Sequence, residues 1–432
     1  MRSGRHPCLQ LTALAVLLLL GSCSSSQSPG RKLTFWAMGR EGEAVQQLMP
    51  AFEHEHPDIH VVVQILPWKV AHQKLLTAFA GDTLPDVCQL GNTWIPELAE
   101  LGALQPLGPR VRSSRTVDPE DYFPGIWDTN IVNGTLYGVP WYVDTRLLFY
   151  RKDLLAQAGF DHPPASWAEW ARQMAAIKAR VGPSRFATLL PLNEFEQLES
   201  FGLQESQPML RDGGRYGNFE SPGFKHALRF YASFFRNGWA PKVTNTEISN
   251  PWAAFAQGYF VFYVSGPWNI EEFRNRMPAR LKHDWATAPL PGPHGPGASL
   301  AGGSSLVIFR ASRHKQAAWL LTEYLSQPDV ERRFYRLLGD MPPRRSAWDH
   351  STLANDPHAR AFRIQLERAR PVPKVPEWER IAAQLALVGE RLGHGELTVD
   401  QAAKLLDQRS NDILAKRRWV LAHGHSAETG PP

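Results

Sequence analysis

The chain of 432 residues has few cysteines, since Cys8, Cys23 and Cys88 are the only three. A disulfide framework of the kind that stabilises small secreted domains is therefore excluded. Cys88 lies in the apolar stretch DVCQL, where a free thiol is most often a small packing residue. Strong charge of one sign is also missing: the formal net charge is +5, and the basic residues are scattered. Nucleic acid is therefore not expected as a partner.

The sequence also lacks the motifs of common enzymes. It contains no Gly-x-Ser-x-Gly, no Gly-x-x-x-x-Gly-Lys-Ser/Thr phosphate loop and no His-Glu-x-x-His. His54 and His56 are two residues apart, so on a helix they point to different sides, and no metal or cofactor is expected. One enzymatic alternative stays open, because Glu43 and Asp144 could supply the two facing carboxylates of a glycosidase.

The first residues, MRSGRHPCLQLTALAVLLLLGSC, indicate secretion. A basic start precedes an apolar stretch that is too short to be a membrane span. The last four of these residues, LGSC, resemble a bacterial lipoprotein box, which implies cleavage before Cys23 and acylation of its thiol and new amino group. Residues 1–22 are then a signal peptide and 23–30 a lipidated linker, which holds the protein to a membrane in the periplasm or at the cell exterior. The alternative is ordinary secretion with an incidental cysteine.

From residue 32 onward, the pattern of apolar residues alternates between strands and helices. We expect strands at 32–38, 60–66, 86–90 and 302–309, and helices at 43–54, 70–80, 166–179, 222–236 and 315–326, with a helical C-terminal part from 377 to 416. Strands that are separated by helices predict an α/β fold with a parallel sheet. The length of the chain predicts more than one lobe.

Ligands of such sheets bind at the carboxyl ends of strands. This rule selects four loops, at 39–43, 91–94, 141–146 and 265–268. The last loop follows the apolar run 260–264 and carries Trp268 at the corner where a buried strand passes into a helix. A tryptophan at that corner is well placed to face a cleft.

Aromatic residues are abundant, with 15 Trp and 10 Tyr. Sugars present apolar C–H faces and rings of hydroxyls, so flat aromatic rings beside carboxylates, amides and arginine are typical of a carbohydrate site. The residues that fit this description are Glu43, Trp94, Trp141, Tyr142, Asp144, Trp268 and Arg344. Trp94 and Trp141 fit a packing role as well as a role in the cleft.

Four stretches of the chain together resemble the family 1 extracellular solute-binding proteins of sugar ABC importers, and most of all their maltose/trehalose-binding branch. They are LPDVCQLGNTWIPELAELGALQPL, LYGVPWYVDTRLLFYRKDLL, FAQGYFVFYVSGPWNIEEF and AGGSSLVIFRASRHKQAAWLLTEYLSQP. The resemblance covers residues 32 to about 416. It implies a type II periplasmic-binding-protein fold, in which two α/β lobes are joined by several hinge crossings and hold the ligand between them.

The resemblance also implies where the lobes begin and end. Lobe one would comprise 31–142 and 287–341, lobe two 145–284 and 346–420, and a flexible tail 421–432. The crossings would lie near 142–145, 286–291 and 342–345.

The resemblance also implies which residues bind the ligand. The positions that match it are Glu43, Tyr142, Asp144, Trp268, Gly303 and Arg344. Where the branch has an acid in the third-strand loop, this chain has Gly91 with Asn92 and Thr93 beside it, and Ser304 replaces a tryptophan after the paired glycines. These two departures leave the identity of the sugar open.

The function implied is capture of an α-glucoside disaccharide, such as trehalose or maltose, and its delivery to a membrane permease. We expect a monomer without catalytic activity. Two alternatives remain, a receptor for another solute such as glycerol phosphate, and a secreted glycosidase.

Overall fold

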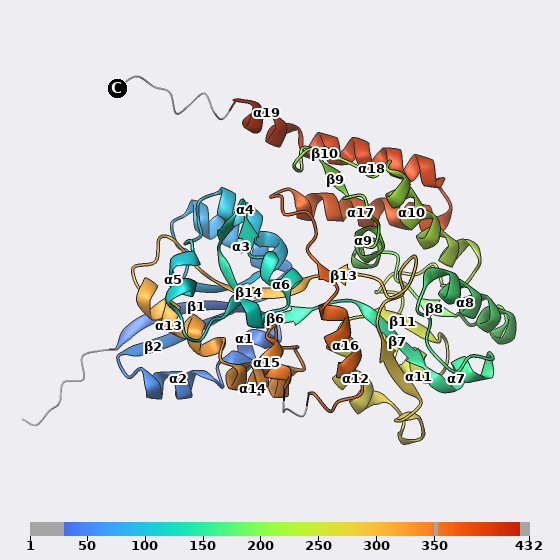
Figure 1. Cartoon of the computed structure of the whole chain (residues 1–432), viewed down its shortest axis with the longest axis horizontal. Helices are drawn as coiled ribbons and strands as arrows, with labels where there is room; N and C mark the ends of the chain where they lie inside the picture. Colours follow the sequence, from blue (N-terminus) through green and yellow to red (C-terminus); the bar gives the residue numbers. More distant parts are fainter. Residues whose placement is uncertain (1–29, 350–352, 424–432) are drawn as a thin grey trace, which may run out of the picture.

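The computed structural model describes residues 30–349 and 353–423, and the predicted signal peptide and lipidation site at Cys23 lie outside them. In the described part, two groups of strands lie side by side, each covered by helices (Figure 1). Residues from the N-terminal third build most of the first group, and residues from the middle of the chain build the second. The expected α/β class is confirmed.

A five-stranded sheet in the order β2-β1-β3-β14-β6 forms the centre of the first lobe. Its strands are β1 (Arg31–Met38), β2 (Ile59–Leu66), β3 (Val87–Gly91), β6 (Gly138–Asp144) and β14 (Gly302–Ile308). β1 pairs in parallel with β2 and β3, as predicted, but β14 is antiparallel to β3 and β6. Gly302 pairs with Asp144, so the chain returns to this sheet at the end where it left, and β14 must run in the opposite direction.

Helices cover both faces of this sheet. They are α1 (Gly39–Val45), α2 (Met49–Glu55), α3 (Trp68–Ala80), α4 (Ile95–Glu100), α5 (Gly108–Ser113), α6 (Pro124–Asp128), α13 (Lys315–Leu325) and α14 (Pro328–Leu338). The single helix expected at 43–54 is two helices, because Pro50 has no N–H to continue the first one and instead stands in the first turn of α2. Trp141 is 1% exposed and stacks on Phe334 at 4.5 Å, so it belongs to the core.

A four-stranded sheet in the order β12-β7-β11-β8 forms the second lobe. Its strands are β7 (Leu147–Arg151), β8 (Thr188–Leu189), β11 (Phe262–Ser265) and β12 (Trp285–Ala288). Every residue of β11 is buried, which agrees with the uninterrupted apolar run from which this strand was predicted. Only Thr145 and Arg146 separate β6 of the first sheet from β7 of the second.

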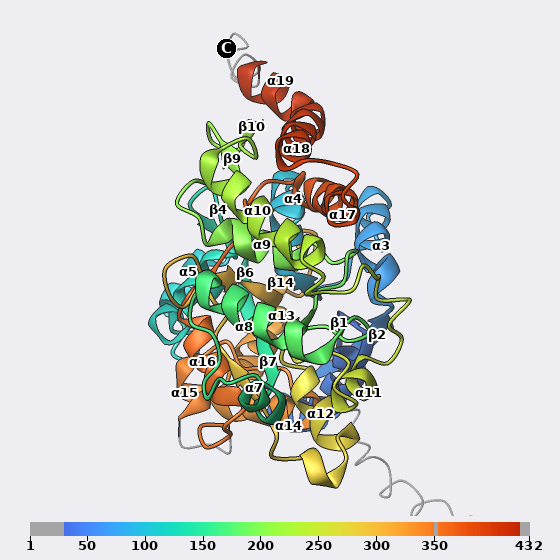
Figure 2. The same cartoon turned by 90° about the vertical axis from the view of Figure 1, so that its right-hand side faces the viewer.

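The helices of the second lobe are α7 (Lys152–Gln157), α8 (Trp167–Val181), α9 (Glu196–Leu203), α10 (Pro222–Arg236), α11 (Pro251–Ala256), α12 (Asn269–Arg276), α16 (Ala359–Leu366), α17 (Trp378–His394) and α18 (Val399–Ile413). Ser166 caps α8, since its hydroxyl accepts a hydrogen bond from the Glu169 N–H. In Figure 2, α18 and the last helix, α19 (Ala415–His423), lie at the opposite end of the molecule from α12 and α14.

Short elements complete the described part. They are the strands β4 (Ile131–Val132), β5 (Thr135–Leu136), β9 (Leu210–Arg211), β10 (Tyr216–Gly217), β13 (Ser299–Leu300) and β15 (Ala369–Arg370), the helix α15 (Arg345–Trp348), and the 3₁₀ turns η1 (Asn92–Trp94), η2 (Pro119–Asp121) and η3 (Ala279–Leu281). Within residues 30–349 and 353–423, no helix has the length and apolar character needed to cross a membrane.

The exact lobe boundaries stay a prediction, and two elements bear on them. β12 pairs with β7 as far as Ala288, so the boundary expected at 287 lies inside a strand of the second sheet. Leu421–His423, expected in the flexible tail, form the last turn of α19, and the rest of that tail lies outside the described residues.

Cys88 is fully buried in the first lobe, which confirms its packing role.

Candidate ligand-binding cleft

A cavity of about 670 Å³ lies where the two sheets approach each other. Each of the four loops that the strand-end rule selected contributes to its wall. The lining residues are 39–41 after β1, 91–94 at the end of β3, 142–144 and Arg146 at the end of β6, and 267–268 after β11. The loops after β1 and β3 belong to the first lobe, and the loop after β11 belongs to the second. A molecule in this cavity therefore touches both lobes.

Most of the residues expected to bind a ligand line this one cavity. They are Asn92, Thr93, Tyr142, Asp144, Trp268 and Gly303. Glu43 and Arg344 do not line it. For Trp94, both a packing role and a role in the cleft were open. The structure shows both, because Trp94 lines the cavity and its ring packs edge-on against that of Trp68, with the ring centres 5.7 Å apart.

Glu41 occupies the position that was expected for Glu43. Both residues belong to the first helical turns of α1, where side chains two positions apart point in different directions, and Glu43 faces solvent. The Glu41 carboxylate accepts hydrogen bonds from the Tyr142 hydroxyl at 3.2 Å and from the Trp68 indole N–H at 3.4 Å. Burial raises the pKa of Glu41, and these two hydrogen bonds lower it in part.

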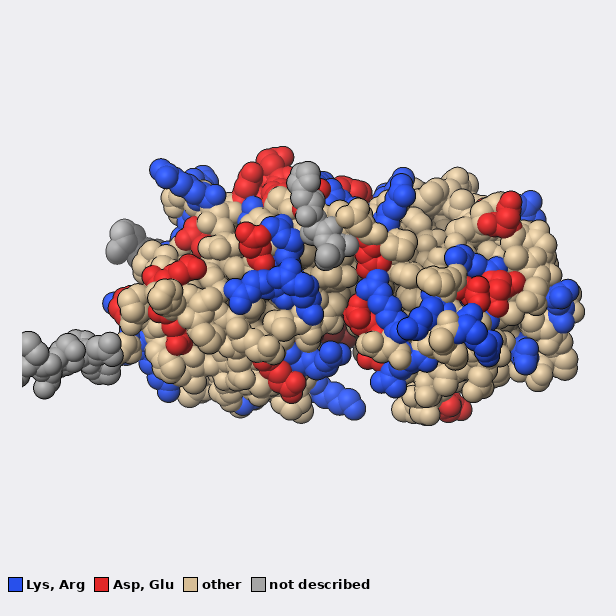
Figure 3. All heavy atoms as spheres, turned by 90° about the horizontal axis from the view of Figure 1, so that it is seen from below, with Lys and Arg blue, Asp and Glu red and all other residues tan. Residues whose placement is uncertain are grey.

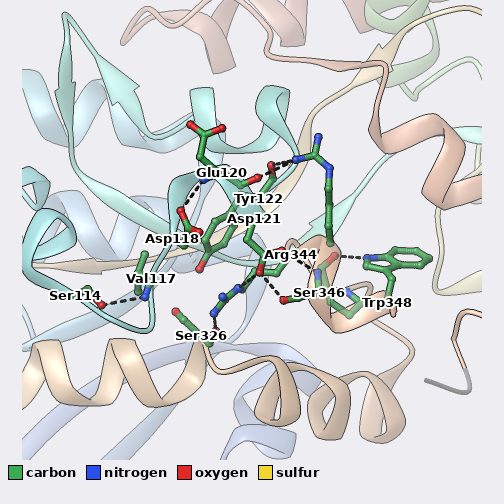
Figure 4. Close-up of polar contacts among 12 residues, drawn as sticks. Ser114, Val117, Asp118, Glu120, Asp121, Tyr122, Ser326, Arg344, Ser346 and Trp348 are labelled. Atoms are coloured by element: carbon green, nitrogen blue, oxygen red, sulfur yellow. Dashed lines mark hydrogen bonds and ion pairs between the residues drawn. The ribbon is translucent and has the colours of Figure 1, made fainter. Parts of the chain in front are cut away.

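The Arg344 side chain is held in a network of hydrogen bonds and does not line the cavity (Figure 4). Its Nε donates to Asp121 Oδ2 at 2.6 Å, its Nη1 donates to the Ser326 carbonyl at 2.5 Å, and the residue is 7% exposed. Asp121 also accepts a hydrogen bond from the Ser346 N–H at 2.8 Å. Burial by itself raises the pKa of Asp121, but the hydrogen bonds from Ser346 and Arg344 outweigh it and lower that pKa. This arginine therefore ties the third crossing to η2.

Arg146 organises the second-lobe side of the cavity. Its Nη1 donates to Asp144 Oδ1 at 2.8 Å and its Nη2 donates to Glu196 Oε1 at 2.9 Å, so both ends of the guanidinium are fixed. The same guanidinium lies 4.8 Å from the centre of the Trp268 ring. A buried cation held by two carboxylates supports one face of an aromatic ring in this position.

Trp268 is 36% exposed, unlike the core tryptophans. Its ring lies over Gly266, where an added Cβ would come within 2.0 Å of the ring carbon Cζ3. The Ser-Gly-Pro sequence before Trp268 is thus explained, because only glycine leaves room for the ring. Packing on Gly266 and Arg146 fixes the ring in one orientation and leaves part of it open to the cavity.

Tyr142 connects the elements of the first lobe beneath the cavity. Its hydroxyl accepts hydrogen bonds from Gln89 Nε2 and from Ser304 Oγ, each at 3.0 Å, and donates one to Glu41. Gly303 has a φ of +115°, and an added Cβ there would lie 2.3 Å from the Tyr142 carbonyl oxygen. Ser304, which replaces a tryptophan of the related branch, thus helps to position Tyr142.

Several lining residues were not predicted from the sequence. They are Trp68, Phe195, Glu196, Glu199, Asp340, Trp378 and Glu379. Trp68 follows the carboxyl end of β2, and this strand-end position is the signal in the sequence that marks it. The others come from α9, from α17 and from the turn after α14, and no local motif marks them.

Carboxylates outnumber guanidinium groups in the wall. The acids are Glu41, Asp144, Glu196, Glu199, Asp340 and Glu379, and the bases are Arg40 and Arg146. Among the described residues, Asp340 Oδ2 is buried without a hydrogen-bond partner. Burial, together with the charges of Glu41 and Asp144, raises the pKa of Asp340 well above its ordinary value. Such a wall suits a neutral ligand that donates hydroxyl hydrogen bonds, and it repels an anion.

Comparison with known proteins identifies the family. The family model described as bacterial extracellular solute-binding protein matches residues 37–332. The chain belongs to this family. Its description as extracellular agrees with the secretory signal predicted from the first residues.

Three relatives illustrate the similarity. The structure of the sugar-binding protein MalE from Xanthomonas citri is 58% identical, with a TM-score of 0.89, over 90% of this chain and 99% of that one. A binding protein of Brucella abortus (strain 2308) is 28% identical over 90% of this chain and 96% of its own length. The galactooligosaccharide-binding protein of Bacillus subtilis (strain 168) is 23% identical over 90% of this chain and 94% of its own length. The two-lobe, type II periplasmic-binding-protein fold that the sequence predicted is confirmed by the first of these matches.

Proposed function

We propose that this protein is the substrate-binding lipoprotein of an ABC sugar importer. It captures an α-glucoside disaccharide, such as trehalose or maltose, and delivers it to a permease in the membrane. The observation that carries the proposal is the cavity in which the open part of the Trp268 ring faces an acidic wall built by both lobes. A sugar ring packs its C–H face on the indole and donates its hydroxyls to the carboxylates.

The similarity to other binding proteins supports the sugar class. The structure that is 58% identical is that of a sugar-binding protein, and a curated relative is a galactooligosaccharide-binding protein. The α-glucoside is the finer part of the proposal and rests on the resemblance to the maltose/trehalose branch. Binding occurs by hinge closure, because a ligand that contacts both lobes stabilises the closed arrangement relative to the open one.

The charge of the cavity argues against the first alternative, a receptor for glycerol phosphate. An anionic ligand needs cations in excess of the carboxylates around it. Arg146 is already paired with Asp144 and Glu196, and the charge of Arg40 acts on the carboxylates of Glu41 and Asp340. The glycosidase alternative relied on Glu43 facing Asp144, but Glu43 does not line the cavity. We propose a receptor without turnover, which binds its sugar in a stoichiometric complex.

A thermal-shift screen over a panel of sugars tests the proposal. A ligand present at a hundred times its Kd stabilises the folded protein by about 2.7 kcal/mol. Maltose or trehalose is therefore expected to raise the melting temperature by several degrees, while glycerol phosphate leaves it unchanged. A shift with glycerol phosphate alone would contradict the sugar assignment.

The anchor is a separate part of the proposal. We expect acylation at Cys23 to hold the mature protein at the membrane surface, as the LGSC sequence implies. Cys23→Ala removes the acylated residue, so the variant protein is expected in the soluble fraction, whereas the parent protein sediments with membranes. Cys88→Ala is the matched control, since this cysteine is buried in the first lobe. Sedimentation of the Cys23→Ala variant with membranes would rule out the lipid anchor.

A further inference from the structure

Asp340 stands opposite Asp144 in the wall of the main cavity. The Val143 N–H donates to the Met341 carbonyl oxygen at 2.8 Å, and these two residues form an antiparallel bridge. In antiparallel pairing, the residues next to such a bridge also lie opposite each other, and side chains at opposite positions share a face. Asp144 and Asp340 are therefore neighbours across the two segments, and both line the cavity.

Three carboxyl groups share this part of the wall, and two of them are bound by donors. The Glu41 carboxylate accepts two hydrogen bonds, and Asp144 accepts one from Arg146. Hydrogen bonds of this kind favour the charged form of both groups. Asp340 differs, because within residues 30–349 and 353–423 its buried Oδ2 has no hydrogen-bond partner. If one of the three groups carries a proton, it is Asp340.

The charges inside the cavity favour the neutral form of Asp340. Burial raises the pKa of Asp340 well above its ordinary value, and the charges of Glu41 and Asp144 add to this effect. The guanidinium of Arg40 opposes it. The Tyr142 hydroxyl between these groups stays neutral, because burial and the same carboxylates raise its pKa well above the ordinary value.

Charged groups outside the cavity affect Asp340 less. Figure 3 views the molecule from the side that carries α12 and α14, and shows acidic and basic side chains together along the hollow between the two halves. Glu271 of α12 is the acid beside the turn after α14, since an added Cβ at Gly339 would lie 3.4 Å from its Cγ. Its carboxylate is paired with Arg274 at 2.5 Å, and both side chains are partly exposed. Water screens paired charges of this kind.

We propose that Asp340 is a neutral carboxylic acid that donates a hydrogen bond from its O–H group to an oxygen of the bound sugar. This inference rests on the proposed function and adds a recognition residue to it. A sugar hydroxyl both donates and accepts, whereas the charged acids of the wall can only accept. Binding then requires the proton on Asp340. Affinity therefore falls as the pH rises through the pKa of Asp340, because the ionised group cannot donate.

Infrared spectroscopy tests the neutral state of Asp340 directly. A neutral carboxyl group has a C=O stretching band that a carboxylate lacks. At neutral pH, the difference between the spectra of the parent protein and Asp340→Asn is expected to contain this band. Binding of maltose or trehalose is expected to shift the band, because the O–H group then donates to the sugar. Absence of the band, or a band that does not shift in the complex, would overturn the inference.

Calorimetric titration of the same sugars from about pH 5 to pH 9 tests the consequence for binding. Asp340→Leu keeps the branching of the side chain without a polar atom. Its affinity at neutral pH is expected to be at least about fivefold lower than in the parent protein, which corresponds to about one net hydrogen bond. Asp340→Asn keeps an N–H donor, so it is expected to lose less affinity than Asp340→Leu and to show no loss at alkaline pH. In the parent protein, the affinity and the infrared band are expected to decline together, and loss of the band without loss of affinity would contradict the donor role.

Glu331→Gln is the matched control. Glu331 is another buried acid whose pKa is raised well above its ordinary value, chiefly by burial, and it does not line the cavity. The variant is expected to bind sugar with the affinity and the pH dependence of the parent protein. Equal affinity in Asp340→Leu and the parent protein would overturn the inference and leave sugar binding intact. Failure of both sugars to bind, with the infrared band present, would overturn the proposed function instead of the neutral state of Asp340.

Discussion

Trp268→Ala is expected to weaken sugar binding at least about tenfold, the equivalent of 1.4 kcal/mol, while the protein stays folded. The indole provides the flat apolar face of the cavity, and stacking contributes about 1 kcal/mol in addition to the area that it buries. The ring is 36% exposed and lies over Gly266 and Arg146, so its removal leaves the interior of the second lobe unchanged. Calorimetric titration of the sugar into the purified variant measures the effect.

Two further variants make the result for Trp268 specific. Trp268→Phe keeps a smaller aromatic face, so its affinity is expected to lie between those of the parent protein and Trp268→Ala. Trp419, on α19, is also an exposed tryptophan, at 63%, and does not line the cavity, so Trp419→Ala is expected to bind as the parent does. An unchanged affinity in Trp268→Ala would reject the stacking role.

Arg146→Met is expected to reduce both affinity and stability. The methionine fills part of the space but leaves Asp144 and Glu196 without their cation, and it removes the support beneath the Trp268 ring. Loss of one partner of a fully buried ion pair costs about 3–5 kcal/mol, and the partial exposure of the two carboxylates lowers this to about 2 kcal/mol. Affinity for the sugar is expected to fall at least about tenfold. Denaturant unfolding and calorimetric titration measure the two effects.

Arg151 provides a matched control for Arg146. It is another buried arginine of the second lobe, held by Asp153 through Nε and Nη2 at 2.8 and 2.7 Å, and it does not line the cavity. Arg151→Met is expected to lose stability in the same way and to retain the affinity of the parent protein in the fraction that is folded. If both variants lose affinity equally, Arg146 acts only through the stability of the lobe.

Much of the fold follows from patterns that are local in the sequence. The apolar run at 260–264 and the apolar patterns at 166–179 and 222–236 each predicted an element that the structure contains. The direction of β14 could not be predicted in this way, because it depends on where the chain returns from the second lobe. The break between α1 and α2 was missed although Pro50 signalled it.

The site was predictable where it depends on strand ends and unpredictable where it depends on the approach of the lobes. The strand-end rule selected the loops that carry Asn92, Tyr142 and Trp268, and these three residues line one cavity. Glu199 and Glu379 come from helices whose positions are set by tertiary packing, so no local pattern marked them.

The two expected residues that lie outside the cavity show a different limit. Glu43 and Glu41 are equally plausible acids in sequence, and only the orientation of the first turn of α1 distinguishes them. Arg344 was assigned by resemblance, but its partner Asp121 is 223 positions away in the chain and holds it elsewhere. Family resemblance predicts which residue type stands at a position, and the local partners decide what that residue does.

A crystal structure of the protein with the sugar selected by the thermal-shift screen tests the central claim most directly. We expect a sugar ring packed against the open part of the Trp268 indole, with hydroxyls donated to carboxylates of both lobes, including Glu41 and Asp144. A sugar bound outside this cavity, or bound to one lobe alone, would contradict the account.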